Sequence, residues 1–470
     1  MQKKADKLAL DINRYSGRIK PLHGVNNCPI RFGEEKIPEF ESAGIPFVRT
    51  HDSGGPYGRG TLIDIPNIFR DFDADPDDPA SYDFAFTDIY LRNLVNSGCK
   101  IFYRLGITIE NFYAIKAYRT APPKDFKKWA RICEGVIRHY NHGWAGGFHY
   151  GIEYWEIWNE PENPPMWSGS MEEYFKLYST TAKHLKKQFP EIKVGGYASC
   201  GFYAVTRDGM NDFYRSFITW FDEFLIYAKK ERAPLDFYSW HLYTSDLDEL
   251  ITHAEYVTKK LRKAGFDRTE NIFNEWNYID KTAKGYAKFD SMKEIPAALF
   301  IAGAFCRMQD SPIDKAMYYD AEPSRTYCGL FYFPSQRVTP AYYAFKTFNE
   351  LYKLRNRIEC SGIRTRNIFT LAAADEHAAA AMLVNSGKAE RKIELETSAS
   401  LKKAEITLLD KEHSFSLVKS LLRGHILTLP QESILLLRIP LKEKTSGTGT
   451  HSNCCEPEKE NRQNFAGLAG

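Results

Sequence analysis

Short apolar runs alternate with longer amphipathic segments over residues 20–352. The segments between the runs repeat apolar positions at helical spacing: in residues 170–189, Tyr174, Leu177 and Tyr178 share one face and lysines fill the other. The eight strand-like runs are IKPLHGVN, PFVRTHD, KIFYRLGI, YWEIWNE, IKVGGYA, LDFYSWHLY, NIFNEWNY and KAMYYDA. Eight strand–helix units predict a (β/α)8 TIM barrel. A doubly wound sheet is the alternative that periodicity leaves open.

The remaining segments have a different pattern. Residues 353–442 contain short, turn-bounded apolar runs such as AAAAMLVNS and ESILLLRIPL without long helical segments, which predicts a C-terminal β-sandwich. Within the N-terminal segment, residues 1–19, the apolar LALDI is a candidate extra strand of that sandwich. Residues 443–470 are polar, Gly-rich and unpatterned, which predicts a disordered tail.

Charge and cysteine content exclude several classes of protein. The 63 basic and 60 acidic residues give a net charge of +3, which offers no case for nucleic acid or a membrane surface as partner. No apolar run is long enough for a signal peptide or a membrane span. The nine cysteines are scattered and show no CxxC spacing, which argues against zinc and disulfides and favours the cytoplasm. The sequence has no GxGxxG or P-loop motif, and we expect no cofactor.

Polar residues end several of the predicted strands. The active site of a TIM barrel lies at the C-terminal ends of its strands, so these residues are candidate site residues. The candidate sugar contacts are His51 and Asp52 after the second strand, His241 and Tyr243 on the sixth, Trp276 on the seventh, Asp320 after the eighth, and Trp167 in the loop after the fourth. Their structural alternatives are satisfied histidines, loop packing and strand-end caps. Metal binding by His51, Asp52 and His241 is not expected, since no HxH or HExxH spacing is present.

Two glutamates in YWEIWNEP compete for a chemical role. Strand alternation places Glu156, Trp158 and Glu160 on one side and Asn159 on the other, so it does not separate the glutamates. Glu156 lies mid-strand and would need a buried partner, for which Arg104 is a candidate. Glu160 precedes a proline and is expected at the rim.

A third glutamate favours Glu160 as the reactive one. Glu275, in NIFNEWNY, ends the seventh strand, which faces the fourth across the mouth of a barrel. Two carboxylates on opposite sides of one bond are the arrangement that glycoside hydrolysis needs. Apolar neighbours (Trp155, Trp158 and Trp167) and an anionic Glu275 would raise the pKa of Glu160, and His241 or Tyr243 could hydrogen-bond Glu275.

The motifs also carry a family resemblance. WEIWNEPEN, FNEWN and HGVN resemble the retaining glycoside hydrolases of the (β/α)8 clan that carry acid and nucleophile on strands four and seven. WNEPENPPMW followed by SMEEYFKLYSTTAKHLK is most similar to glycoside hydrolase family 39, the family of β-xylosidases and α-L-iduronidase; RTHD and TPAYYAFKTFNEL fit it too. The resemblance implies Glu160 as acid/base, Glu275 as nucleophile and Asn159 as partner of the sugar 2-hydroxyl. NEWN departs from the family's more usual Thr-Glu start, so the neighbours of Glu275 differ.

The expected activity is that of a retaining exo-glycosidase acting on short β-linked oligosaccharides, most simply a β-xylosidase. Another sugar (a β-glucoside, an α-L-arabinoside or a uronide) is the alternative within the family. A uronide would need a cationic cradle, for which Arg49, Arg59 and Arg104 are candidates. A catalytically silent carbohydrate-binding barrel is disfavoured, because a binder needs neither glutamate. The sugar, the linkage, the aglycone preference and the oligomeric state, a homo-oligomer included, stay open.

Overall fold

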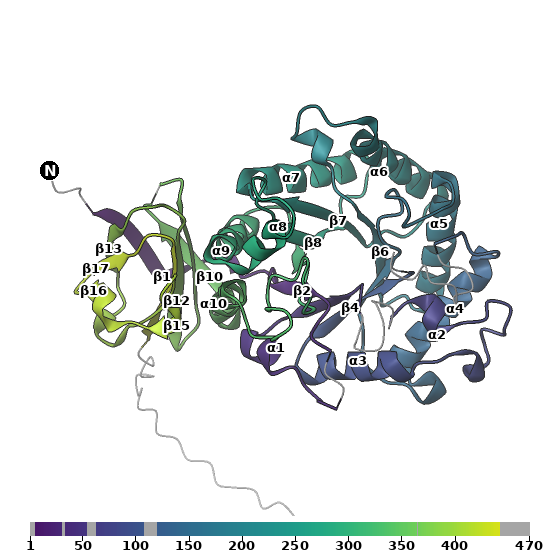
Figure 1. Ribbon diagram of the computed structural model, residues 1–470, viewed down its shortest axis with the longest axis horizontal. Coiled ribbons are helices and arrows are strands. Elements are labelled where there is room, and N and C mark those ends of the chain that lie inside the picture. Colours follow the sequence, from purple (N-terminus) through teal and green to yellow (C-terminus); the bar gives the residue numbers. More distant parts are fainter. Residues whose placement is uncertain (1–4, 31–32, 54–62, 108–119, 364, 442–470) are drawn as a thin grey trace, which may run out of the picture.

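The computed structural model describes residues 5–30, 33–53, 63–107, 120–363 and 365–441. It has two parts side by side, a barrel ringed by helices and a smaller sheet (Figure 1). The tail, residues 443–470, and Arg59 lie outside the described residues. Within the described ranges, none of the helices combines the length and the apolar character needed to cross a membrane.

Eight strands in chain order close into a parallel barrel, which confirms the predicted fold class. Each of the eight strand-like runs in the sequence supplies one strand. The strands are β2 (Gly24–Asn26), β3 (Phe47–Thr50), β4 (Lys100–Leu105), β5 (Tyr154–Ile157), β6 (Lys193–Ser199), β7 (Phe237–Thr244), β8 (Glu270–Tyr278) and β9 (Lys315–Tyr318).

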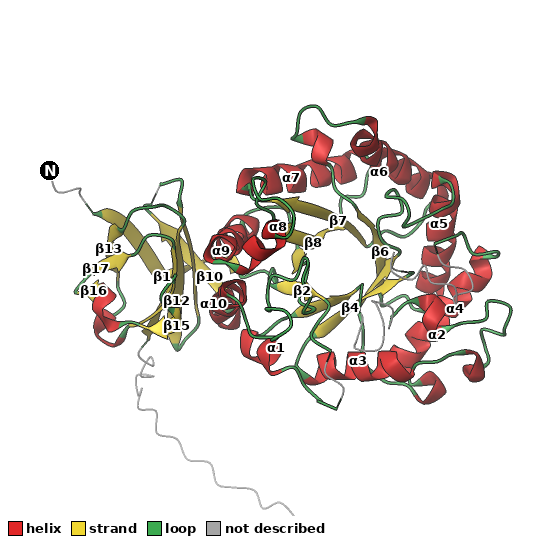
Figure 2. Ribbon diagram, in the orientation of Figure 1, coloured by secondary structure: helices red, strands yellow, loops and turns green. Residues whose placement is uncertain are grey.

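Helices surround the barrel (Figure 2). They are α1 (Pro38–Ala43), α2 (Ile65–Ile68), α3 (Ala85–Asn96), α4 (Phe126–His142), α5 (Met171–Gln188), α6 (Asp212–Glu231), α7 (Leu247–Lys263), α8 (Ala287–Asp290), α9 (Ile295–Gln309) and α10 (Pro340–Leu354). Helix α5 shows how the sequence sets such an element: Ser170 and Glu173 form a capping box at its start. Its buried face includes Tyr174, Leu177 and Tyr178, as the spacing predicts.

The barrel interior is layered. At its N-terminal end a cluster of buried apolar side chains fills the lumen: Phe47, Phe102, Tyr154, Phe237, Ile272 and Met317. Side chains two residues apart on a strand point to the same face, so the next layer comes from Arg49, Glu156, Ser239 and Asn274. The lumen therefore changes from apolar to polar toward the C-terminal ends of the strands.

The second part is one ten-stranded sheet of mostly antiparallel strands that curls over its own apolar core. Its strands are β1 (Asp6–Arg18), β10 (Asn356–Ser361), β11 (Ile368–Ala374), β12 (Ala378–Asn385), β13 (Arg391–Thr397), β14 (Glu405–Leu409), β15 (Ser414–Leu417), β16 (Leu422–Arg423), β17 (Ile426–Leu429) and β18 (Ser433–Pro440). The predicted sandwich is thus a single curled sheet. LALDI lies in β1, which pairs with β10 and β13.

Helices α9 and α10 separate the barrel from the sheet (Figure 1). Helix α9 contacts β8 on one side and β11 and β12 on the other, so almost every residue of it is buried. This explains why IPAALFIAGAFCRM is apolar on all its faces rather than amphipathic.

Candidate active site

Glu160 reaches the site because the chain leaves regular strand geometry after β5. Trp158 and Glu160 have φ values of 74° and 45°, in the left-handed region that non-glycine residues rarely adopt. The side chain of Asn159 consequently lies in the lumen, where its Oδ1 accepts a hydrogen bond from Arg49 Nη2 at 2.6 Å. Trp158 turns outward and donates from Nε1 to the Met166 carbonyl at 2.8 Å. The sides assigned to Trp158 and Asn159 by strand alternation are therefore wrong.

Glu275 reaches the same place through a bulge in β8. Phe273 lies opposite Trp240 of β7, and Glu275 lies opposite His241, so Asn274 is an extra residue on β8. Two consecutive side chains thereby face the lumen. Asn274 Nδ2 donates to Glu156 Oε1 at 2.6 Å, and Glu275 Oε2 accepts from Arg49 Nη1 at 3.1 Å.

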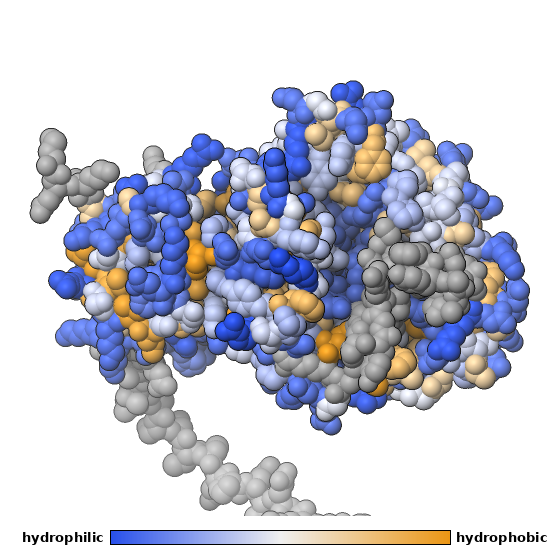
Figure 3. Space-filling view, viewed as in Figure 1, coloured by the Kyte–Doolittle hydropathy of each residue, from blue (hydrophilic) through white to orange (hydrophobic). Residues whose placement is uncertain are grey.

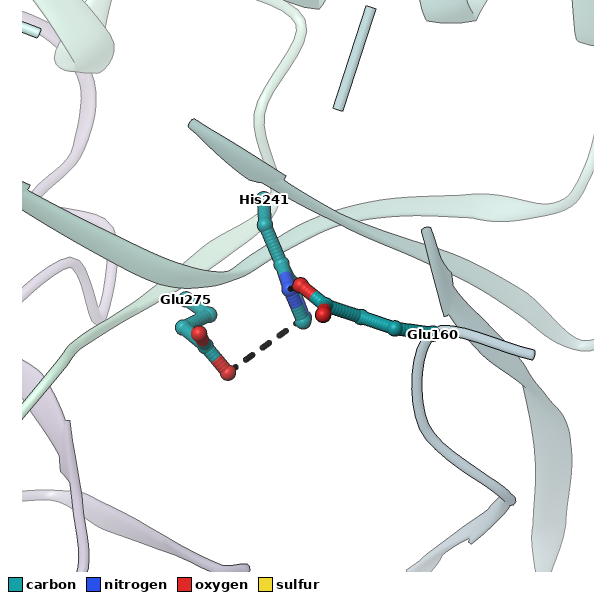
Figure 4. A group of neighbouring side chains, drawn as sticks. All are labelled: Glu160, His241 and Glu275. Carbon is teal, nitrogen blue, oxygen red and sulfur yellow. Dashed lines mark hydrogen bonds and ion pairs between the residues drawn. The ribbon is translucent and has the colours of Figure 1, made fainter. Parts of the chain in front are cut away.

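Glu160 and Glu275 face each other across His241 (Figure 4). His241 Nδ1 lies 2.7 Å from Glu160 Oε1, and His241 Nε2 lies 3.6 Å from Glu275 Oε2. One atom of each residue lies within 4.8 Å of the others. The two glutamate side chains are 12% and 8% exposed. In the space-filling view, the middle of the barrel is hollowed and its visible wall is mostly hydrophilic (Figure 3).

Among the described residues, these three also form a group whose donor atoms lie close enough to one another to hold a metal ion. His51 and Asp52 do not belong to this group. The buried Arg49 guanidinium donates to Glu275, and a positive charge at this position disfavours a divalent cation.

Arg49 connects the polar layer of the lumen to the site. Its guanidinium is fully buried; Nε donates to Glu156 Oε2 at 2.7 Å, and Nη1 also donates to Asn26 Oδ1 at 3.0 Å. Arg49 is therefore the buried partner of Glu156. The prediction of Arg104 for this role is wrong, because Arg104 Nη2 donates to Asp64 Oδ1 at 2.6 Å.

Several predicted sugar contacts gather around Glu275. The Tyr243 hydroxyl donates to Glu275 Oε1 at 2.5 Å, and His51 Nε2 lies 4.0 Å from Glu275 Oε2 and 3.2 Å from Asp52 Oδ2. Tyr319, which is not among the residues predicted from the sequence, donates its hydroxyl to Asp52 Oδ2 at 2.7 Å. Its position could have indicated this contact, because Tyr319 comes two residues after Met317, whose side chain lies on the lumen side of β9.

Asp320, the last polar candidate, is buried beside this group. Its Oδ2 accepts a hydrogen bond from Asn27 Nδ2 at 3.3 Å. Strand β2 pairs with β3 on one side and with β9 on the other. His51 and Asp52 follow β3 and Asp320 follows β9, so the three side chains come from the C-terminal ends of strands that flank β2.

The two candidate tryptophans lie elsewhere. Trp167 is 3% exposed and packs edge-on against Trp158 and Tyr174, with its Nε1 donating to the Ser170 carbonyl. Trp276 is 1% exposed and packs against Phe305 of α9 on the outer side of the barrel. These placements favour interior packing over sugar stacking for both.

The two glutamates experience different electrostatic surroundings. Burial raises the pKa of Glu160, but the hydrogen bond and the charge of His241 outweigh burial and leave this pKa below its ordinary value. The expectation of a raised pKa is thus wrong for the free site, because His241 approaches Glu160 so closely. Burial raises the pKa of Glu275; Glu160 adds to this rise, while His241 and Arg49 oppose it.

Comparisons with known proteins add a family assignment. Residues 35–320 match the model of glycosyl hydrolases family 39. The chain is 30% identical over 212 residues to a beta-xylosidase of Geobacillus stearothermophilus, covering 42% of this chain and 38% of that protein. It is 26% identical over 311 residues to a beta-xylosidase of Caldicellulosiruptor saccharolyticus, covering 59% of each. These alignments leave much of both relatives unmatched.

Among solved structures, a glucosidase from Croceicoccus marinus superposes with a TM-score of 0.72 at 21% identity, covering 94% of this chain and 99% of that one. At this level of identity the likeness concerns the fold.

Proposed function

The chain belongs to glycosyl hydrolase family 39, and from this membership we propose that it is a retaining, exo-acting β-xylosidase. Its substrates would be short β-linked oligosaccharides with a terminal xylose. The observation that carries the proposal is the pair of carboxylates formed by the partly buried Glu160, just after β5, and the buried Glu275 on β8, with oxygens within 4.8 Å of each other. Retaining glycosidases hold their carboxyl groups about 5–5.5 Å apart, whereas inverting enzymes need about 6.5–9.5 Å to admit water.

Glu275 is the proposed nucleophile. Its two oxygens accept hydrogen bonds from different donors, Tyr243 on Oε1 and the Arg49 guanidinium on Oε2. These donors hold the carboxylate in one orientation, and the cation favours its ionised form against the effect of burial. A nucleophile needs both properties, because its oxygen must meet the anomeric carbon along a fixed direction.

Glu160 is the proposed acid/base, working with His241. In the first step a Glu275 oxygen attacks the anomeric carbon, the glycosidic C–O bond breaks, and the carboxyl proton of Glu160 passes to the leaving oxygen. This step leaves a glycosyl ester on Glu275. In the second step Glu160 takes a proton from water, the water oxygen attacks the anomeric carbon, and Glu275 leaves as a carboxylate.

The sugar is the finer part of the proposal. The two matched relatives named beta-xylosidase support xylose, and Asn159, which Arg49 holds in the lumen, is the proposed partner of the sugar 2-hydroxyl. A uronide finds less support. Arg49 and Arg104, two of its candidate cradle residues, are buried and already bonded to Glu156 and Asp64. A β-glucoside or an α-L-arabinoside is the remaining alternative.

The test is turnover of 4-nitrophenyl β-xyloside, β-glucoside and α-L-arabinoside, with the anomer of the released sugar followed by NMR. We expect the xyloside to be the best substrate and its configuration to be retained. A 2-fluoro-xyloside with an activated leaving group should label Glu275, and Glu275→Ala should lose turnover. Inversion of configuration or labelling of another residue would refute the mechanism. Binding of xylosides without turnover of any glycoside would instead identify a carbohydrate-binding barrel.

A further inference from the structure

The mechanism does not use Glu162, a buried carboxyl next to the site. Glu162 lies two residues after Glu160, and its residue is only 4% exposed. Its Oε1 accepts two hydrogen bonds, from Ser199 Oγ at 2.8 Å and from the Cys200 backbone N–H at 2.7 Å. Its Oε2 is buried and has no hydrogen-bond partner among the described residues. An ionised carboxylate at this place would keep a charged oxygen without compensation.

Among the residues that the structure describes, the groups around Glu162 do not supply a compensating charge. Glu160 faces it from the same loop, and the neighbouring elements present tyrosine hydroxyls: Tyr174 from α5, Tyr197 from β6 and Tyr238 from β7. Burial, followed by the negative charge of Glu160, raises the pKa of Glu162 to about 8, although Ser199 and Cys200 oppose the rise. The neutral acid is the form that this environment favours.

The contacts of Glu162 fasten the loop that carries Glu160. The Glu160 N–H donates to the Ala198 carbonyl at 3.0 Å, and the next two residues of the same chain segment, Ser199 and Cys200, donate to Glu162. The loop is thereby held on the end of β6 at both residues. The φ of 45° at Glu160 is an uncommon backbone conformation, which persists only when its surroundings hold it.

We propose that Glu162 is a positioning residue that holds a proton at neutral pH and, through Ser199 and Cys200, fixes Glu160 opposite His241. This inference rests on the proposed acid/base role of Glu160. A neutral Glu162 makes the tether without placing a second negative charge behind Glu160. Loss of the tether would let the loop relax and move the proton donor away from the leaving oxygen.

Two variants and two substrates test the positioning. Glu162→Gln keeps the Oε1 acceptor without a charge and should retain kcat/KM on phenyl β-xyloside within about threefold. Glu162→Ala should lose about tenfold to a hundredfold on this substrate, because small displacements of a catalytic group are that costly. On 2,4-dinitrophenyl β-xyloside, whose leaving group needs little protonation, the Ala variant should lose far less. Glu172→Ala, at an exposed residue of α5, is the matched control and should change neither value.

An infrared titration of the whole protein tests the proton without turnover. The difference spectrum of the wild type minus Glu162→Gln should show a protonated carboxyl band that disappears as the pH passes about 8; subtraction removes the contribution of Asp320, whose pKa burial also raises. If the band is missing from this difference spectrum, or if Gln is as damaging as Ala, the proposal is overturned. Equal losses of the Ala variant on both xylosides would also overturn it. Should no glycoside be turned over, the proposed function fails, while the band still decides whether Glu162 holds a proton.

Discussion

Replacing Arg49 by Met should remove the hydrogen bonds that join the buried ion pair in the lumen to the site. Arg49 carries the hydrogen bonds to Glu156, Asn26, Asn159 and Glu275, and its side chain is fully buried. Met has a similar length and no charge. The substitution leaves Glu156, also fully buried, without its cation.

The expected cost follows from this geometry. Removing one partner of a buried ion pair costs about 3–5 kcal/mol, because the other charge stays buried and uncompensated. Neutralising Glu156 as well should recover part of that cost, so Arg49→Met with Glu156→Gln should be more stable than the sum of the single variants predicts, by about 2 kcal/mol. Activity should not recover. Asn159 and Oε2 of Glu275 still lack the Arg49 donor, and loss of such a donor costs about 10²–10³ in kcat.

The measurements are the midpoint of urea unfolding, followed by tryptophan fluorescence, and turnover of 4-nitrophenyl β-xyloside. Arg70→Met is the control: its ion pair with Asp83 is exposed, so we expect a change below about 1 kcal/mol. Strict additivity of the two substitutions, or recovery of activity in the double variant, would refute the coupling described for Arg49.

Two further predictions concern stability and packing. Burial lowers the pKa of His23 to about 3, so the ring is neutral in the folded protein. The unfolded pKa is about 6.5. The contribution of the neutral ring to stability is therefore present above pH 6.5 and is lost as the pH falls toward 3. Its Nε2 contacts the Gly44 carbonyl at 3.1 Å. From pH 6.5 to pH 5, the unfolding free energy of the wild type should therefore fall by about 2 kcal/mol more than that of His23→Gln. Urea unfolding at both pH values measures this difference. Parallel pH profiles of the two proteins would contradict the prediction. Trp167→Phe should lower the melting temperature and leave KM for the xyloside within about twofold, since Trp167 is packed between Trp158 and Tyr174. A large rise in KM at unchanged stability would instead support a stacking platform.

The sequence by itself predicts which polar residues gather at the C-terminal ends of the strands. The alternation of strand-like and helix-like segments predicts a barrel, and the ends of parallel strands meet at one edge. The sequence therefore predicts that residues as distant in the chain as His51, Glu160, His241 and Glu275 lie together, and the structure brings them together around His241. Only local patterns and the topology they imply were needed for this.

The partner of each buried charge was decided by the tertiary structure. Arg104 lies beside Glu156 in the strand register, yet its guanidinium turns to Asp64, and Arg49 takes Glu156 instead. The extra residue at Asn274 and the left-handed backbone at Glu160 likewise redirect side chains that strict alternation would place differently. A period of two gives the face of a strand on which a side chain starts. The direction of its charged end depends on bulges, backbone dihedrals and the distances between neighbouring elements, which exist only in the folded chain.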